Sequence, residues 1–282
     1  MVWFYLSIGA ALSFASLGLL SRVVSLKSKN PRLLSVIFNL SATLMSFGVF
    51  FASGAYRKIA LPTGWSPWLF LSLTILSYGL YERLRFYMTK SLEASHLTII
   101  SNTSLVVAVI ISFILYSEPL TSSKISGFLL ILFSLVLVSI DGTRKINWRG
   151  VFLAILGNCL LGIGWALDKK GMFYFNLETY NLMAWSLPLI VLYFPYIKLS
   201  DLKNEIKVAS WKVIVLAFLN VFGYLMNLKA LSLAEATKVI PVVQTSTIFT
   251  VIFGLIFLKE RKHVLRKIIA AAIAVFGVYL LV

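Results

Sequence analysis

The chain of 282 residues is 60% hydrophobic and only 13% charged, yet it carries a net charge of +16. A soluble domain is closer to half apolar and a quarter charged, so this composition excludes an ordinary soluble protein. The Lys and Arg residues lie in short segments between apolar blocks, which is typical of topology signals and lipid contacts and argues against a nucleic-acid-binding surface.

Apolar blocks long enough to cross a bilayer follow one another along the whole chain. An α-helix needs about 20 apolar residues to do so. Ten blocks qualify: 2–22, 33–53, 67–88, 94–116, 123–140, 149–168, 178–197, 210–231, 234–258 and 264–282. The first block lacks a basic leader and a small-residue cleavage site, so we expect a retained span and not a signal peptide. The pattern predicts an all-α, multi-pass integral membrane protein of the cell or inner membrane.

Two segments of the chain repeat the same polar pattern. Residues 93–118 read EASHLTIISNTSLVVAVIISFILYSE, and residues 235–260 read EATKVIPVVQTSTIFTVIFGLIFLKE. Both begin with Glu-Ala, carry an amide followed by Thr-Ser, and end in Glu. This repetition predicts two five-helix repeats, residues 1–142 and 143–282. Because five is odd, the second repeat must enter the membrane from the opposite side, which is the inverted arrangement common in secondary transporters.

Three stretches carry a resemblance to a known family. LYSEPLTSSKISG and FLKERKHVLRK each place an acidic residue near a helix end, and LKALSLAEATKVIPVVQ contains an Ala-Leu, small-residue and Pro-Val run. In these features the whole chain resembles the ten-span, EamA-like branch of the drug/metabolite transporter superfamily, although Ile99 stands where the second half has Pro241. The resemblance implies a central cavity lined by spans 1, 3, 4, 6, 8 and 9, with spans 5 and 10 peripheral. It implies metabolite transport but no particular substrate.

Four amides lie about 13–15 Å by helical rise from the start of their own spans, near the middle of the membrane. They are Asn102, Asn158, Asn220 and Gln244. Amides at this depth either join helices by hydrogen bonds or line a polar cavity. Their common depth on four spans favours the cavity, and Trp165 and Tyr224 complete this candidate substrate-binding set.

Ionisable residues within the spans are further candidates for substrate binding. The third span contains Glu82, Arg83 and Arg85 in the stretch YERLRFY. Glu82 and Arg85 are three positions apart and can pair on one helix face, so a structural ion pair and a substrate or proton site are both open. Lys238, near the hairpin between spans 8 and 9, either captures an anionic group at the cavity mouth or extends to the lipid–water interface.

No catalytic or metal-binding pattern is present in the sequence. There is no His-x-x-x-His, no Walker loop and no Gly-x-Ser-x-Gly, and Cys159 is the only cysteine. We therefore expect neither an enzyme nor a cofactor, but a monomeric or dimeric secondary transporter in contact with membrane lipid. Its predicted substrate is a small polar metabolite, amino-acid-like or otherwise zwitterionic or anionic, carried by alternating access. A non-transporting scaffold or lipid-handling subunit is the alternative.

The distribution of basic residues bears on orientation. Most Lys and Arg residues, among them Lys27, Lys29 and Lys262, fall on the side of the membrane opposite the two termini. The positive-inside rule then makes that side cytoplasmic and leaves the termini outside, whereas the family resemblance favours termini inside.

Overall fold

The computed structural model describes residues 1–92, 94–139, 148–194, 197, 199–246, 248–250, 253 and 264–281. Within these residues all regular structure is helical. The α-helices are α1 (Val2–Ser25), α2 (Pro31–Ala52), α3 (Ser66–Ser91), α4 (Ala94–Tyr116), α5 (Ser122–Ser139), α6 (Trp148–Tyr174), α7 (Leu177–Ser186), α8 (Pro188–Tyr193), α9 (Leu202–Ala209), α10 (Lys212–Leu233), α11 (Ala236–Gln244) and α13 (Val264–Leu281). Two short 3-10 turns, η1 (Ala55–Lys58) and η2 (Leu199–Asp201), lie between them.

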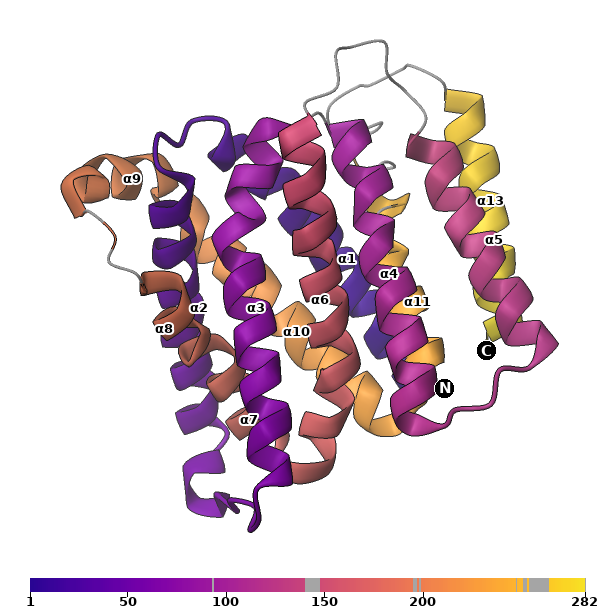
Figure 1. The fold of residues 1–282 in the computed structure, drawn as a ribbon, viewed down its shortest axis with the longest axis horizontal. Coiled ribbons are helices and arrows are strands. Elements are labelled where there is room, and N and C mark those ends of the chain that lie inside the picture. The colour runs from indigo at the N-terminus through magenta and orange to yellow at the C-terminus, as the bar shows by residue number, and fades with distance from the viewer. Residues whose placement is uncertain are drawn as a thin grey trace.

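The helices form one bundle, with both chain ends near the same end of it (Figure 1). Helix α1 packs along α10, α3 and α4 pack along α6, and α5 pairs with α13. Helix α2 contacts α7, α8 and α10. Four helices, α1, α2, α6 and α10, are long and apolar enough to cross a membrane by length and composition.

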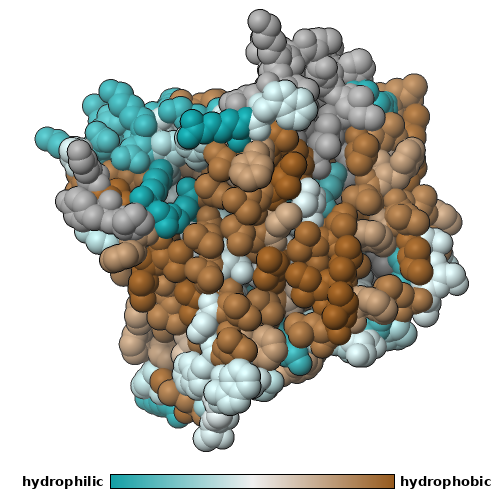
Figure 2. Space-filling view, in the orientation of Figure 1, coloured by the Kyte–Doolittle hydropathy of each residue, from teal (hydrophilic) through white to brown (hydrophobic). Residues whose placement is uncertain are grey.

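The outside of the bundle is apolar over its middle. Figure 2 shows a hydrophobic surface across the face in view, with hydrophilic residues gathered toward the upper left, around α9. Large apolar side chains such as Leu44, Phe152 and Val275 are exposed. Exposed apolar surface on this scale requires a lipid environment, and the protein is accordingly an integral, multi-pass membrane protein.

The observed helices depart from the predicted blocks at several places. The predicted block 178–197 is split into α7 and α8 at Leu187, because Pro188 has no N–H to continue the helical hydrogen bonding. The sixth block does not end at 168, since α6 continues to Tyr174. The segment predicted as a connection before residue 210 contains the amphipathic helix α9.

Helix α9 fastens the turn between α1 and α2. Its Glu205 carboxylate is fully buried and accepts hydrogen bonds from Ser28 Oγ at 2.7 Å, Lys29 N at 2.8 Å and Asn30 N at 2.9 Å. The Asn30 side chain in turn caps α2 by accepting from Leu33 N, and Pro31 follows at the first helical position.

Candidate functional site

A fully buried acid lies where four helices of the bundle meet. Asp168 of α6 has no exposed surface. Tyr78 of α3 donates a hydrogen bond to Asp168 Oδ2 at 2.5 Å. Tyr180 of α7 and Tyr224 of α10 donate to Oδ1 at 3.0 and 2.7 Å. We name these four residues the Asp168 cluster. Both carboxylate oxygens are therefore occupied by phenolic hydroxyls from three different helices.

The sequence of α6 makes room for the two nearest tyrosine rings. Gly164, Asp168 and Gly171 are spaced four and three residues apart, so they share one face of the helix. A Cβ at Gly164 would lie 2.5 Å from Tyr78 Cε1, and one at Gly171 would lie 2.2 Å from Tyr180 Cε2. Any larger residue at either position would push a tyrosine away from the carboxylate.

Unsatisfied polar groups occur on the same helices as the Asp168 cluster. Both amide atoms of Asn181 and the Oδ1 atom of Asn227 are buried without a hydrogen-bond partner among the described residues. The same holds for the indole N–H of Trp185, whose ring packs edge-on against Tyr224 at 5.9 Å. Buried polar atoms are nearly always paired with protein or water, so these groups mark an interior able to bind water or a polar solute.

A second polar cluster, formed by Asn39, Glu82 and Arg85, is fully paired. Arg85 Nη1 donates to Glu82 Oε1 at 2.9 Å, and Asn39 Nδ2 donates to Glu82 Oε2 at 3.2 Å. The Arg85 guanidinium also stacks over the ring of Phe38 at 4.6 Å. We call this the Glu82 cluster. Its geometry fits the structural alternative for Glu82, in which the charge is neutralised by a partner on the same helix.

Arg83 is directed away from the Glu82 cluster. Its Nη1 donates to the carbonyl oxygen of Phe194 at 2.9 Å and to that of Val191 at 3.4 Å, at the C-terminal end of α8. Arginine side chains stabilise helix C-termini in this way. Arg83 also lines a groove of about 470 Å³ together with Lys29 and Arg32. Arg83 therefore has a structural role at the end of α8, and its role in substrate binding stays a prediction.

The four predicted amides are all buried, but their bonding differs. Neither amide atom of Asn102 has a partner among the described residues. Asn158 Nδ2 instead donates to the Ala154 carbonyl of its own helix at 2.7 Å. Asn220 is 8% exposed and Gln244 is 5% exposed. Of the four, Asn102 is the one whose two amide atoms are both fully buried and without a partner among the described residues.

The remaining predicted residues fall in different surroundings. Tyr224 contacts Asp168 directly. Trp165 is partly buried and packs against the apolar cluster that contains Leu105 and Ile240. Lys238 is partly exposed near the start of α11. Of the nine candidates, Tyr224 alone donates a hydrogen bond to the buried acid of α6.

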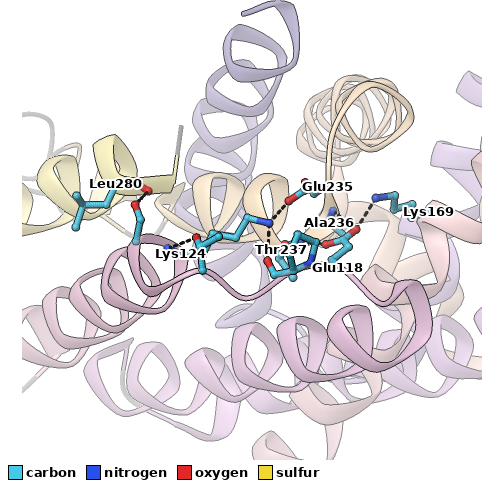
Figure 3. A network of polar contacts seen from close by, with 10 residues as sticks. Glu118, Lys124, Lys169, Glu235, Ala236, Thr237 and Leu280 are labelled. Carbon is cyan, nitrogen blue, oxygen red and sulfur yellow. Dashed lines mark hydrogen bonds and ion pairs between the residues drawn. The ribbon is translucent and has the colours of Figure 1, made fainter.

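Next to Asp168 in the chain, Lys169 belongs to a separate polar network with Glu118 and the start of α11 (Figure 3). Lys169 Nζ contacts Glu118 Oε1 at 2.5 Å. Glu118 also accepts hydrogen bonds from the backbone N–H groups of Ala236 and Thr237, both at 2.9 Å, at the start of α11. Burial opposes ionisation of Glu118, but these bonds outweigh burial and lower the pKa of its carboxyl below the ordinary value.

Sequence reasoning missed Asp168 because this residue ended an apolar block beside Lys169 and Lys170 and was assigned to the edge of the span. Two signals in the sequence pointed to it. One is an acid flanked by Gly164 and Gly171 on the same helix face. The other is the presence of tyrosines inside several apolar spans. Only the packing of α3, α7 and α10 on α6 brings these groups together.

Comparisons with known proteins agree with this architecture. The model of the EamA-like transporter family matches residues 1–140 and 148–282. A relative from Archaeoglobus fulgidus, described as an uncharacterized transporter, is 28% identical over 267 residues, which cover 91% of this chain and 89% of the relative. A crystal structure whose description names no function superposes with a TM-score of 0.74, covering 99% of this chain and 95% of the other.

The crystal structure is only 14% identical, so its likeness concerns the fold alone. The family match shows more than the fold, because it is a match of sequence that spans almost the whole chain and agrees with the apolar helical bundle. Members of this family are transporters and not enzymes. On this evidence the chain belongs to the EamA-like transporter family.

Proposed function

We propose that the protein is a secondary transporter of a small polar solute, working by alternating access between two inverted repeats, residues 1–142 and 143–282. The solute is amino-acid-like or otherwise zwitterionic or anionic. The ten predicted spans would then divide equally between the repeats. The family match, which falls into two ranges of similar length, supports this division.

Helix boundaries that recur along the chain support the repeat. Helices α3 and α10 end at Ser91 and Leu233, and α4 and α11 begin at Ala94 and Ala236. Both ends of α5 also recur in α13, and every one of these pairs is separated by 142 positions. The packing follows the same relation. In the proposed repeat α1 corresponds to α6 and α3 to α10, and α1 lies along α10 while α6 lies along α3.

One hydrogen bond supports a two-fold relation between the repeats. Thr43 Oγ1 of α2 donates to the Trp185 carbonyl of α7 at 2.9 Å. These two positions are also 142 apart. Equivalent residues of an inverted pair can touch each other only close to the pseudo-axis, where substrate sites of inverted-repeat transporters are found.

The observation that carries the proposal is the Asp168 cluster. Tyr78 comes from the first proposed repeat, and the other three members come from the second. A polar group buried between two such repeats is a functional site by default, because placing it there is costly. Moving the repeats against each other would separate Tyr78 from the carboxylate and open the polar interior.

The unpaired amides favour a polar or zwitterionic solute. Leaving a buried donor or acceptor unsatisfied costs about 1–3 kcal/mol, which a bound solute or water would recover. Asn102 and Asn181 each have both amide atoms unpaired among the described residues. Since an amide both donates and accepts, it can bind the ammonium as well as the carboxylate of a zwitterion.

Counterflow in proteoliposomes tests this function. Vesicles containing the purified protein are loaded with the standard L-amino acids and diluted into isotopically labelled amino acids, and the label inside is measured by mass spectrometry. We expect labelled amino acids to accumulate only in vesicles that contain protein. No exchange of these, or of a parallel mixture of small carboxylic acids, would refute the proposed substrate class.

Variants then test the amide assignment. Replacing both Asn102 and Gln244 with Ala should slow exchange by at least about tenfold if each contributes a hydrogen bond of about 1 kcal/mol or more. Asn204→Ala in α9, outside the long helices, is the matched control and should leave the rate unchanged. A folded double variant that exchanges at the wild-type rate would remove these two residues from the site.

A further inference from the structure

We propose that Asp168 is a proton-binding site and that loading and unloading of this proton accompany the transport cycle. This inference deepens the proposed transport function, and the coupling part rests on it. The argument begins with the charge of the group. Asp168 is completely buried, and no Lys, Arg or His side chain in the described part of the chain forms an ion pair with it.

Two other buried acids of the bundle have the counter-charge that Asp168 lacks. Glu82 is paired with Arg85, and Glu118 is paired with Lys169. Glu205 lies on α9 at the end of the bundle, where two backbone N–H groups and a serine hydroxyl bind it. Asp168 receives only phenolic hydroxyls. A carboxylate buried without a counter-charge is strongly disfavoured in a membrane protein, and a bound proton removes the charge.

The neighbouring cations are directed elsewhere. Lys169, the next residue, contacts Glu118. Lys170 lies over the rings of Phe70 and Tyr116, at 5.6 and 5.4 Å from their centroids. Both lysines therefore have other partners, and neither neutralises Asp168.

Titratable groups face this part of α6 from each helix that packs on it. They are Tyr78 of α3, Tyr116 of α4, Tyr180 of α7 and Tyr224 of α10. Tyr116 donates to the Ala166 carbonyl at 2.5 Å and thus does not contact the acid itself. Helix α11 carries Lys238, and Glu235, just before its start, pairs with Lys124. Phenols titrate far above neutral pH, so Asp168 is the group of this cluster whose charge a bound proton can change.

The geometry suits a proton better than any larger ligand. Tyr78 Oη and Asp168 Oδ2 are 2.5 Å apart, and a hydroxyl can act as donor or acceptor. Protonation forms one O–H bond on Oδ2, which then donates to Tyr78 Oη as the Tyr78 hydroxyl hydrogen rotates away from the carboxyl, while Tyr180 and Tyr224 continue to donate to Oδ1. No heavy atom has to move. A metal ion or an ammonium group would first have to displace one of the three hydroxyls.

The origin of the tyrosines links this proton to movement of the repeats. Among the described residues, Tyr78 is the partner of Asp168 that belongs to residues 1–142. When the repeats separate, Oδ2 loses this partner and meets water, to which the proton is released or from which it is taken. The balance of the step is one proton bound from water on one side and one returned to water on the other.

Infrared difference spectroscopy of the protein in lipid vesicles, between high and low pH and without any solute, tests the site directly. We expect a C=O stretching band of a buried carboxylic acid at low pH, and we expect Asp168→Asn to lack it. The amide of Asn keeps the shape of Asp and its ability to accept from tyrosine. Glu178→Gln, which removes a carboxyl at the start of α7, should retain the buried-acid band.

A wild-type band that survives in Asp168→Asn would overturn the proposal, as would the absence of any such band. Should Asp168→Asn fail to fold, Tyr78→Phe provides the second test. Loss of the Oδ2 partner must shift the frequency of the band, and an unshifted band would also overturn the assignment.

Coupling is tested separately, with a pH-sensitive dye inside the same vesicles during net amino acid uptake. With the wild type, we expect an imposed pH gradient to drive amino acid entry and the dye to report proton movement. With Asp168→Asn, we expect both the gradient-driven entry and the proton movement to be lost. Proton movement unaffected by Asp168→Asn would refute the coupling. Because the infrared band is measured without solute, failure of counterflow would refute the amino acid proposal while leaving the proton site intact.

Discussion

The Glu82 and Asp168 clusters are both buried in the helical bundle but differ in chemistry. The first consists of Asn39 on α2 with Glu82 and Arg85 on α3. Adding 142, the spacing of the proposed repeats, to these numbers leads to Asn181, Tyr224 and Asn227. In the second half, the ion pair is thus replaced by a tyrosine and an amide, and Asp168 is added from α6.

The difference concerns how completely each polar group is paired. In the Glu82 cluster, charges compensate each other and Asn39 is bonded both to Glu82 and to the Ser35 carbonyl. In the second half, Asn181 and Asn227 have unsatisfied atoms, and the acid has no counter-charge. A fully paired cluster is suited to holding helices together, whereas an incompletely paired one is suited to binding a proton or solute.

The largest expected effect comes from breaking the paired cluster. Arg85→Leu would leave the Glu82 carboxylate buried without its cation. Removing one partner of a buried ion pair typically costs about 3–5 kcal/mol, so we expect a large loss of stability. Thermal unfolding in detergent, followed by tryptophan fluorescence, would measure it.

The double variant Glu82→Leu/Arg85→Leu is the control for this effect. Replacing both partners by apolar residues of similar size is often neutral or stabilising, so most of the lost stability should return. If Arg85→Leu alone were as stable as the wild type, the Glu82 cluster would not stabilise the packing of α2 against α3.

A smaller loss is expected from crowding the Asp168 cluster. Gly171→Ala would place a Cβ 2.2 Å from Tyr180 Cε2 and force the ring away from Asp168. Overpacking of this kind costs about 1–3 kcal/mol. Gly48→Ala is the matched control, because nothing lies within 4 Å of the added Cβ in α2. There, Ala should be neutral or stabilising by helix propensity. Equal stability of the two variants would show that Tyr180 does not need Gly171.

A third acid, Glu118, tests whether a neighbouring cation keeps a buried carboxylate charged. Glu118 is bound by Lys169 and by the start of α11, and its pKa is lowered. The stability that it contributes is complete above the ordinary Glu pKa of about 4.3 and is lost as the pH falls through the lower folded value. We expect unfolding measured against pH to show this loss in acid and Glu118→Gln to abolish it. Persistence of the acid loss in Glu118→Gln would assign it to another group.

The architecture could be predicted from sequence because its signals are local. An apolar block such as 33–53 reveals a span whatever packs against it, and α2 occupies Pro31–Ala52. The pairing of Glu82 with Arg85 is likewise readable from their three-residue spacing. The class of membrane protein and the family were confirmed, while the ten-span count and the inversion remain predictions.

The Asp168 cluster could not be predicted in the same way, because its members are distant in sequence. Tyr78 and Tyr224 are 146 positions apart and meet only because α3 and α10 both lie near α6. The break at Leu187 was missed although Pro188 was visible, since prolines often lie within membrane helices without dividing them. Depth along a single helix selected Asn102 and Asn158 alike, and only packing separates the unpaired amide from the paired one.

The last pair of variants should change stability with opposite signs in the two halves, and so it tests the comparison most directly. Asn181→Leu removes a buried amide that has no partner, and we expect stability to rise by about 1 kcal/mol. Asn39→Leu removes a donor to the charged Glu82, and we expect stability to fall by about 1.5–3 kcal/mol. Thermal unfolding of both variants measures the two signs.

The two variants should also differ in transport. Asn181→Leu should slow counterflow despite the gain in stability, as happens when an unsatisfied polar group is retained for function. Asn39→Leu should lower stability with little change in the rate per folded molecule. If both variants lost stability, Asn181 would have a bonding partner in the folded protein, and the second-half cluster would be as static as the first. If both kept the wild-type rate, the open amide would not belong to the transport site.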